Sequence, residues 1–150
     1  MTRSIEKETF ITASPERVFQ ALTKKADLER WFVQRADIDL QPGGAIRLEW
    51  APEAVENGTI LEVEPHHRLS YNWVALEPTP TTLIFELTPE NGGTRLHLHH
   101  TEIGEGEVWD NYYTTLDSGW NTHFKNLAAL LETGNSEAPK PTGNIHNERV

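Results

Sequence analysis

Residues 107–133 read EVWDNYYTTLDSGWNTHFKNLAALLET, and no other stretch of comparable length in the chain has apolar spacing that fits a helix. Its large side chains recur at alternating steps of three and four residues: Tyr113, Leu116, Trp120, His123, Leu127 and Leu130. This spacing lines side chains along one helical face. A helix that only fills a core would favour Leu, Ile and Ala, so the rings and the histidine indicate the wall of a pocket. Ordinary aromatic packing is the alternative.

Upstream of this helix, apolar and polar residues alternate with period two, as in half-buried strands. Pro- and Gly-rich turns divide the alternating region into the segments Ala36–Leu40, Ala45–Trp50, Thr59–Glu64, Arg68–Val74, Thr81–Thr88 and Thr94–Thr101. Consecutive strands joined by short turns pair antiparallel. We therefore predict a meander with one solvated face and one face covered by the helix.

The N-terminal region predicts one more strand and two short helices. Ile5–Ile11 fits the strand, Ser14 can cap a helix that begins at Pro15, and Lys25–Phe32 fits the second helix. Residues 1–134 are expected to form one domain. Residues 135–150 carry little apolar surface, so we expect a disordered tail.

The charge balance argues against polyanionic partners. Lys and Arg total 13 against 23 Asp and Glu, a net charge of −10, which disfavours nucleic acid and anionic membranes. The absence of Cys excludes disulfides and thiolate metal sites. No apolar run reaches the roughly 20 residues of a membrane span, and no signal peptide begins the chain, so we expect a cytoplasmic protein without a cofactor.

An ordered series of short motifs then resembles one known family. The motifs are ITASPERVF (residues 11–19), LERWF (28–32), LQPGG (40–44), GTILEVEP (58–65), LSYNW (69–73), GTRL (93–96) and GW (119–120). They resemble the activator of heat-shock protein 90 ATPase homologue-like family, within the START-like or SRPBCC superfamily. The resemblance implies an α+β helix-grip fold, with a curved antiparallel sheet of about seven strands wrapped around the long C-terminal helix and two short helices after the first strand.

The resemblance also implies a cavity between sheet and helix that takes a small apolar or amphipathic ligand. The residues whose predicted faces meet there are Trp31, Trp50, Tyr71, Trp73, Phe85, His100, Tyr113, Leu116, Trp120 and His123. Their rings could line an apolar cleft with a few polar handles. A filled aromatic core is the alternative for the whole set.

Three functions fit these features. The leading hypothesis is a non-enzymatic ligand-binding domain, either a monomer or a weak homodimer. The second is a co-chaperone-like interaction module that would use exposed Trp31-Phe32 and the acidic surface to bind a chaperone or another protein. The third is a helix-grip cyclase or hydrolase with His100 or His123 as acid or base.

Histidines also cluster on the last predicted strand, but the sequence does not indicate a metal site there. His97 and His99 should lie on the solvated face and His100 on the inner face, and the sequence shows no carboxylate partner for them. We therefore expect solvated strand histidines, no bound metal, and a fold that forms without an ion. Glu62 shares the parity of inward-facing Ile60, but its place at a strand end favours solvent.

Overall fold

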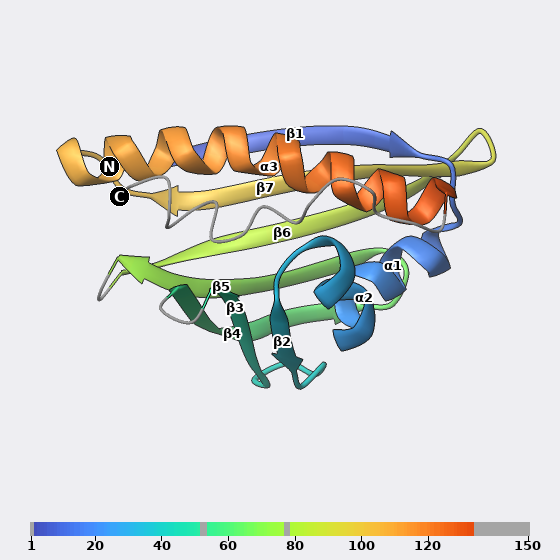
Figure 1. Ribbon diagram of the computed structural model, residues 1–150, viewed down its shortest axis with the longest axis horizontal. Coiled ribbons are helices and arrows are strands. Elements are labelled where there is room, and N and C mark those ends of the chain that lie inside the picture. The colour runs from blue at the N-terminus through green and yellow to red at the C-terminus, as the bar shows by residue number, and fades with distance from the viewer. Residues whose placement is uncertain (1, 52–53, 77–78, 134–150) are drawn as a thin grey trace.

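Seven antiparallel strands form one curved sheet in the computed structural model, which describes residues 2–51, 54–76 and 79–133 (Figure 1). The strands are β1 (Arg3–Ile11), β2 (Arg35–Ile38), β3 (Ala45–Ala51), β4 (Ala54–Glu64), β5 (Arg68–Leu76), β6 (Thr79–Glu90) and β7 (Gly93–Ile103). Their order in the sheet is β1-β7-β6-β5-β4-β3-β2. The predicted meander therefore runs from β2 to β7, and β1 closes the far edge beside β7.

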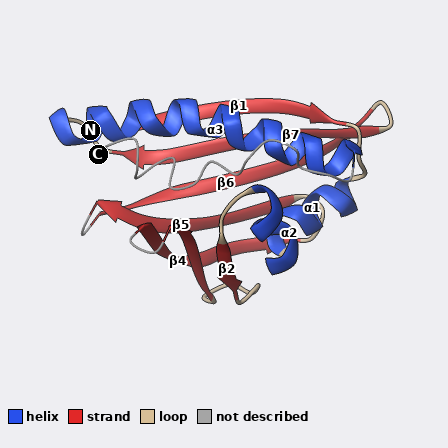
Figure 2. Cartoon of the chain, in the orientation of Figure 1, coloured by secondary structure: helices blue, strands red, loops and turns tan. Residues whose placement is uncertain are grey.

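Three helices complete the fold: α1 (Pro15–Thr23), α2 (Lys25–Trp31) and α3 (Glu107–Thr133). The predicted cap at Ser14 is confirmed, because its hydroxyl accepts a hydrogen bond from the Arg17 backbone N–H at 3.1 Å. The bounds of α3 coincide with the stretch that the sequence pattern predicted. Together these elements are those of the helix-grip fold (Figure 2).

The core lies on the face of the sheet that α3 crosses. Alternate residues of β3, β5, β6 and β7 point into it, as period two requires, and each of them is at most 4% exposed: Ile46, Leu48, Trp50, Leu69, Tyr71, Trp73, Leu83, Phe85, Leu87, Leu96, Leu98 and His100. Helices α1 and α2 close one end of this layer (Figure 1). The inward and outward faces therefore follow the predicted alternation.

Two differences from the expected strands affect the site. β4 begins at Ala54, so residues 54–58, which the turn residues had suggested were a loop, form strand instead. A register shift between Ile60 and Glu62 then changes which residues of β4 face inward. Glu62 lies on the outer face, where its carboxylate accepts a hydrogen bond from Arg68 at 3.0 Å.

Two further expectations concern the chain ends and membranes. The expected tail, residues 135–150, lies outside the described residues. Within the described ranges, no helix combines the length and the apolar composition that crossing a membrane requires.

Candidate functional site

Aromatic side chains from α2, the strands and α3 pack into one continuous group, which we call the ring cluster. It consists of Trp31, Phe32, Trp50, Tyr71, Trp73, Phe85, His100, Trp120 and His123. Phe32, just after α2, is central: its ring centroid lies 4.6 Å from that of Trp31, 4.9 Å from Trp50 and 5.7 Å from Trp120. Offset and edge-to-face contacts at these distances are favourable aromatic pairs.

The ring cluster is closed to solvent. Each of its members is at most 5% exposed, and the tryptophans Trp31, Trp50, Trp73 and Trp120 are at most 1% exposed. A side chain that lined a ligand-sized space would show more accessible surface than this, so these rings pack against one another between the sheet and α3. The filled core, the alternative to an open cleft, is what the described side chains form.

The structure places most of the predicted site residues together but separates one of them. Leu116 lies buried beside the ring cluster, whereas Tyr113 is only partly buried, with its ring 4.8 Å from the Arg3 guanidinium. Tyr112, 1% exposed, takes the inner position instead. Placing Tyr113 on the inner face was wrong because Tyr112 and Tyr113 precede Leu116 by four and three residues, and both spacings fit one helical face.

The prediction that Trp31-Phe32 forms an exposed interaction surface was also wrong. Both side chains are at most 1% exposed, and the Trp31 indole donates a hydrogen bond to the Ala21 carbonyl at 2.8 Å. The close junction of α1 and α2 turns both rings inward, which a sequence pattern at the end of a short helix does not reveal. These two rings are therefore part of the core.

A carboxylate that the sequence reasoning missed lies within this core. Glu56 of β4 is fully buried and accepts hydrogen bonds from the Trp50 indole at 2.9 Å and from the Tyr112 hydroxyl at 3.3 Å. The Trp73 indole donates in turn to the Tyr112 hydroxyl at 3.1 Å. We call Glu56, Trp50, Tyr112 and Trp73 the polar network.

The turn residues predict a connection over residues 51–58, and for this reason Glu56 is not among the site residues that the sequence predicts. The signal that could have found it is the alternation of Ala54, Glu56 and Ile60, which share one parity and are all buried. Glu56 also affects its surroundings electrostatically. Burial and, to a smaller extent, the negative charge of Glu56 raise the pKa of Tyr71, so this phenol stays protonated.

His100 of β7 belongs to a second buried set of hydrogen bonds. The Trp120 indole donates to His100 Nδ1 at 3.1 Å, and Thr81 Oγ1 lies 2.8 Å from Nε2. Because an indole can only donate, Nδ1 accepts and the ring proton is assigned to Nε2, which donates to Thr81. Burial lowers the pKa of His100 to about 3, so the imidazole is neutral at neutral pH.

His123 of α3 is fully buried among rings. Its centroid lies 4.8 Å from Phe32 and 5.3 Å from Trp120, both edge-on, and 5.1 Å from Trp50. Burial also lowers the pKa of His123 to about 3. General acid or base catalysis works best with a pKa near the working pH, so neither histidine is suited to proton transfer at neutral pH.

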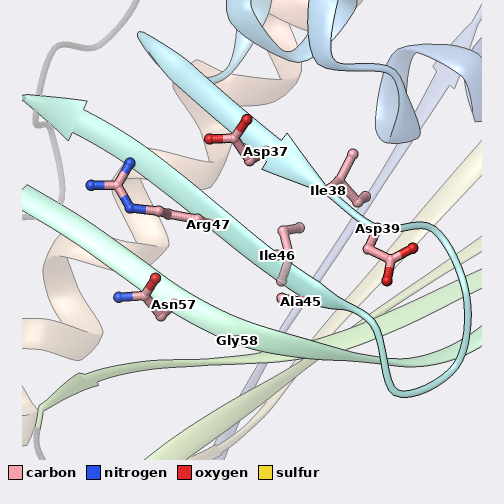
Figure 3. A pocket seen from close by; sticks show the side chains of 8 residues that line it. All are labelled: Asp37, Ile38, Asp39, Ala45, Ile46, Arg47, Asn57 and Gly58. Atoms are coloured by element: carbon pink, nitrogen blue, oxygen red, sulfur yellow. The ribbon is translucent and has the colours of Figure 1, made fainter.

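Open hollows occur elsewhere on the described surface. One, of about 500 Å³, lies over β2, β3 and β4, where Asp37, Arg47 and Asn57 stand side by side on paired strands (Figure 3). Another, of about 490 Å³, lies between β1 and α3 and is lined by Lys7 and Lys125 among others. Neither hollow is lined by a member of the ring cluster or the polar network.

Comparison with solved structures places this arrangement among known folds. A protein from Mesorhizobium loti is 28% identical, with a TM-score of 0.79 over 89% of this chain and 99% of that chain. CalU16 from Micromonospora echinospora is 26% identical, with a TM-score of 0.72 over 99% of this chain and 83% of its own. The Aha1 dimer from Colwellia psychrerythraea is 21% identical, with a TM-score of 0.77 over 88% and 98% of the two chains, which supports the fold alone.

Comparison with protein families gives the assignment. No curated protein matches the chain. The family described as Activator of Hsp90 ATPase homolog 1-like protein matches residues 12–132, which include α1, α2, strands β2 to β7 and nearly all of α3. The chain therefore belongs to the family of Activator of Hsp90 ATPase homolog 1-like proteins, as the resemblance of its motifs had indicated.

Proposed function

We propose that this domain binds a small, largely aromatic or apolar molecule that carries a hydroxyl or amino group, in the ring cluster between the sheet and α3. Glu56 and Tyr112 are the groups that would bind the polar end of the ligand, and the surrounding rings would contact its apolar body. One observation carries this proposal: an ionisable carboxylate, Glu56, is fully buried and hydrogen-bonded to aromatic side chains of the core.

A core that served stability alone has no need of such a group. Removing a carboxylate from water costs several kcal/mol, and well-packed apolar replacements of buried charged groups are often neutral or stabilising. A buried carboxylate is therefore more readily explained by a ligand that it recognises.

The hydrogen bonds of Glu56 also allow a donor of the protein to be replaced by a donor of the ligand. Two of its donors, the Trp50 indole and the Tyr112 hydroxyl, come from other elements, β3 and α3. A ligand hydroxyl or ammonium can replace either donor and keep the carboxylate satisfied. Trp50 and Trp73 stand edge to face beside it, at 6.1 Å and 85°, and offer ring faces to an aromatic or cationic group.

Because the ring cluster is closed, the ligand must bind a form in which rings have moved apart. Such a form is a minor conformation whose population the ligand raises through its greater affinity for it. Phe32 lies in the short connection after α2 and contacts four tryptophans, so its displacement would open the most space. The net charge of −10 favours neutral or cationic ligands over anions.

The two other functions have less support. The interaction module needed exposed rings at Trp31-Phe32, which are buried. The cyclase or hydrolase needed His100 or His123 as an acid or base, and burial keeps both neutral. A protein of the same fold, DynU16, is described as belonging to the dynemicin biosynthetic locus, but at 21% identity it bears only on the fold.

The test compares Glu56→Gln with Glu62→Gln, its matched control on the outer face of the same strand. Wild-type protein and both variants are titrated with phenols, aromatic amines and the corresponding hydrocarbons, with tryptophan fluorescence as readout. We expect saturable binding of phenols or amines to wild type and Glu62→Gln, weakened about 10-fold or more in Glu56→Gln, because a hydrogen bond to a charged group contributes about 1.5–3 kcal/mol.

Native mass spectrometry of the purified protein would show any ligand that remains bound. The absence of saturable binding by every probe, together with no co-purifying molecule, would reject ligand binding. Equal affinity in all three proteins would mean that the domain binds a ligand but that Glu56 does not contact it.

A further inference from the structure

The outer face of the sheet holds a second cluster of titratable groups, on the side away from the ring cluster. His97 and His99 lie two residues apart on β7, so both point outward, and their ring centroids are 4.2 Å apart. Glu6 on the neighbouring strand β1 is directly opposite His99. The carboxylate and both imidazoles therefore meet on one face.

The nitrogen and oxygen atoms of these three residues converge on one point. Glu6 Oε1 lies 3.5 Å from His97 Nε2 and 3.8 Å from His99 Nδ1, and all three atoms lie within 4.8 Å of one another. Zinc binds imidazole nitrogen and carboxylate oxygen at about 2.0–2.2 Å, which separates two tetrahedral ligands by about 3.4 Å. The three side chains are 28–63% exposed, so small rotations bring their atoms to these positions.

Glu86 on β6 orients one of the imidazoles. Its Oε1 lies 3.4 Å from His99 Nε2, and Arg68 forms an ion pair with the other oxygen of the same carboxylate. A carboxylate that holds the proton-bearing nitrogen of a histidine leaves the opposite nitrogen free to coordinate, as is usual for histidines that bind metals. His99 is thereby set to present Nδ1 toward Glu6 and His97.

We propose that Glu6, His97 and His99 bind a divalent transition-metal ion such as Zn²⁺, with Glu86 as a positioning residue. Two imidazoles and a carboxylate suit zinc, copper or nickel and do not suit magnesium, which requires oxygen ligands. Three protein ligands leave a fourth position for water or another ligand. The β1–β7 register brings the ligands together without an ion, so the site is preformed and the fold does not depend on it.

The proposal is independent of the interior site, and its test uses the full chain freed of metal with a chelator. Isothermal titration calorimetry with ZnCl₂ should show one equivalent bound to wild type, and MgCl₂ should show none. Glu6→Gln, His97→Asn and His99→Gln should each weaken Zn²⁺ binding about 10-fold or more, and Glu86→Gln should weaken it about 10-fold, in the lower part of the range for orienting partners.

The matched control is the double variant His66→Asn and His67→Gln, which removes adjacent histidines from the turn between β4 and β5 and should bind Zn²⁺ as wild type does. Circular dichroism checks that each variant is folded. An absence of Zn²⁺ binding to wild type would overturn the proposal. So would undiminished binding by both Glu6→Gln and His99→Gln, or a loss of binding in the His66 and His67 control.

Discussion

His99 and His100 are neighbours on β7, yet they lie in opposite environments. His100 is fully buried, neutral, and held between the Trp120 indole and the Thr81 hydroxyl. The His99 side chain is 28% exposed and lies between two carboxylates, with Glu6 at 3.8 Å and Glu86 at 3.4 Å. The same residue type is thus a structural hydrogen-bonding group on one face of the sheet and a candidate metal ligand on the other.

Strand parity decides what a histidine can do in this sheet. For a histidine that faces inward, desolvation keeps the imidazole neutral, and removing the side chain from the packed core lowers stability. Facing outward, the side chain can move and can meet charged partners from adjacent strands. Changes on the inner face should therefore alter stability, and changes on the outer face should alter ion binding with little effect on stability.

The largest effect should come from Trp120, the inner partner of His100. Because the ring cluster is filled, Trp120→Ala leaves a cavity, and we expect the free energy of unfolding to fall by about 3–5 kcal/mol. Urea denaturation measures it, with His99→Ala as the outer-face control, expected to change stability by less than about 0.5 kcal/mol. A loss below about 1 kcal/mol for Trp120→Ala would show that the interior is not tightly packed.

Acid should lower the free energy of unfolding through the two buried histidines of the inner face. Folding lowers the pKa of His100 and of His123 from 6.5 to about 3, so below pH 6.5 the unfolded chain binds more protons than the native protein. The stability that the two neutral histidines contribute is therefore fully present above pH 6.5 and is lost as the pH drops from there toward 3. Over the first pH unit, the free energy of unfolding should fall by about 1 kcal/mol for each histidine.

Urea midpoints at several pH values between about 7.5 and about 5.5 measure this loss, in a window above the usual range of carboxylate titration. A variant with both His100→Asn and His123→Asn, if circular dichroism shows it folded, should lose most of the dependence. Equal midpoints across the window in the wild-type protein would mean that these histidines are not desolvated.

A smaller effect should follow from removing the acceptor for His100. Thr81→Val keeps the shape of the side chain but leaves the Nε2–H buried without its hydroxyl partner, so we expect a loss of about 1–3 kcal/mol. The adjacent Thr82→Val is the control, because its hydroxyl bonds to exposed Glu102. If the two variants are equally stable, the Thr81–His100 hydrogen bond contributes nothing measurable.

The smallest effect, close to zero, is expected from removing metal. The site at Glu6, His97 and His99 lies on a sheet that forms through its backbone register, so the protein freed of metal with a chelator should remain folded. Added Zn²⁺ in excess should raise the midpoint, because an ion that binds only the native state stabilises it. A metal-free protein that circular dichroism shows to be unfolded would mean that folding depends on the ion.

Local sequence patterns were enough to predict most helices and strands and the faces that they bury. The alternation from Ile46 to His100 predicted which strand residues point inward, and the spacing of Leu116, Trp120, His123 and Leu127 predicted the buried stripe of α3. Ser14 and Pro15 marked the start of α1. These features follow from backbone periods of two and 3.6 residues and from unsatisfied groups at helix ends, which neighbouring residues alone express.

Which side chains meet in the folded protein depends on contacts between segments that are distant in the sequence. Glu56 entered the core through the extension of β4 past the expected turn, and Tyr112 took the place predicted for Tyr113 because α3 is rotated as its packing on the sheet requires. Glu6 reached His97 and His99 through the pairing of the first strand with the last. Register and helix rotation arise from contacts between distant segments, and local periodicity carries no information about them.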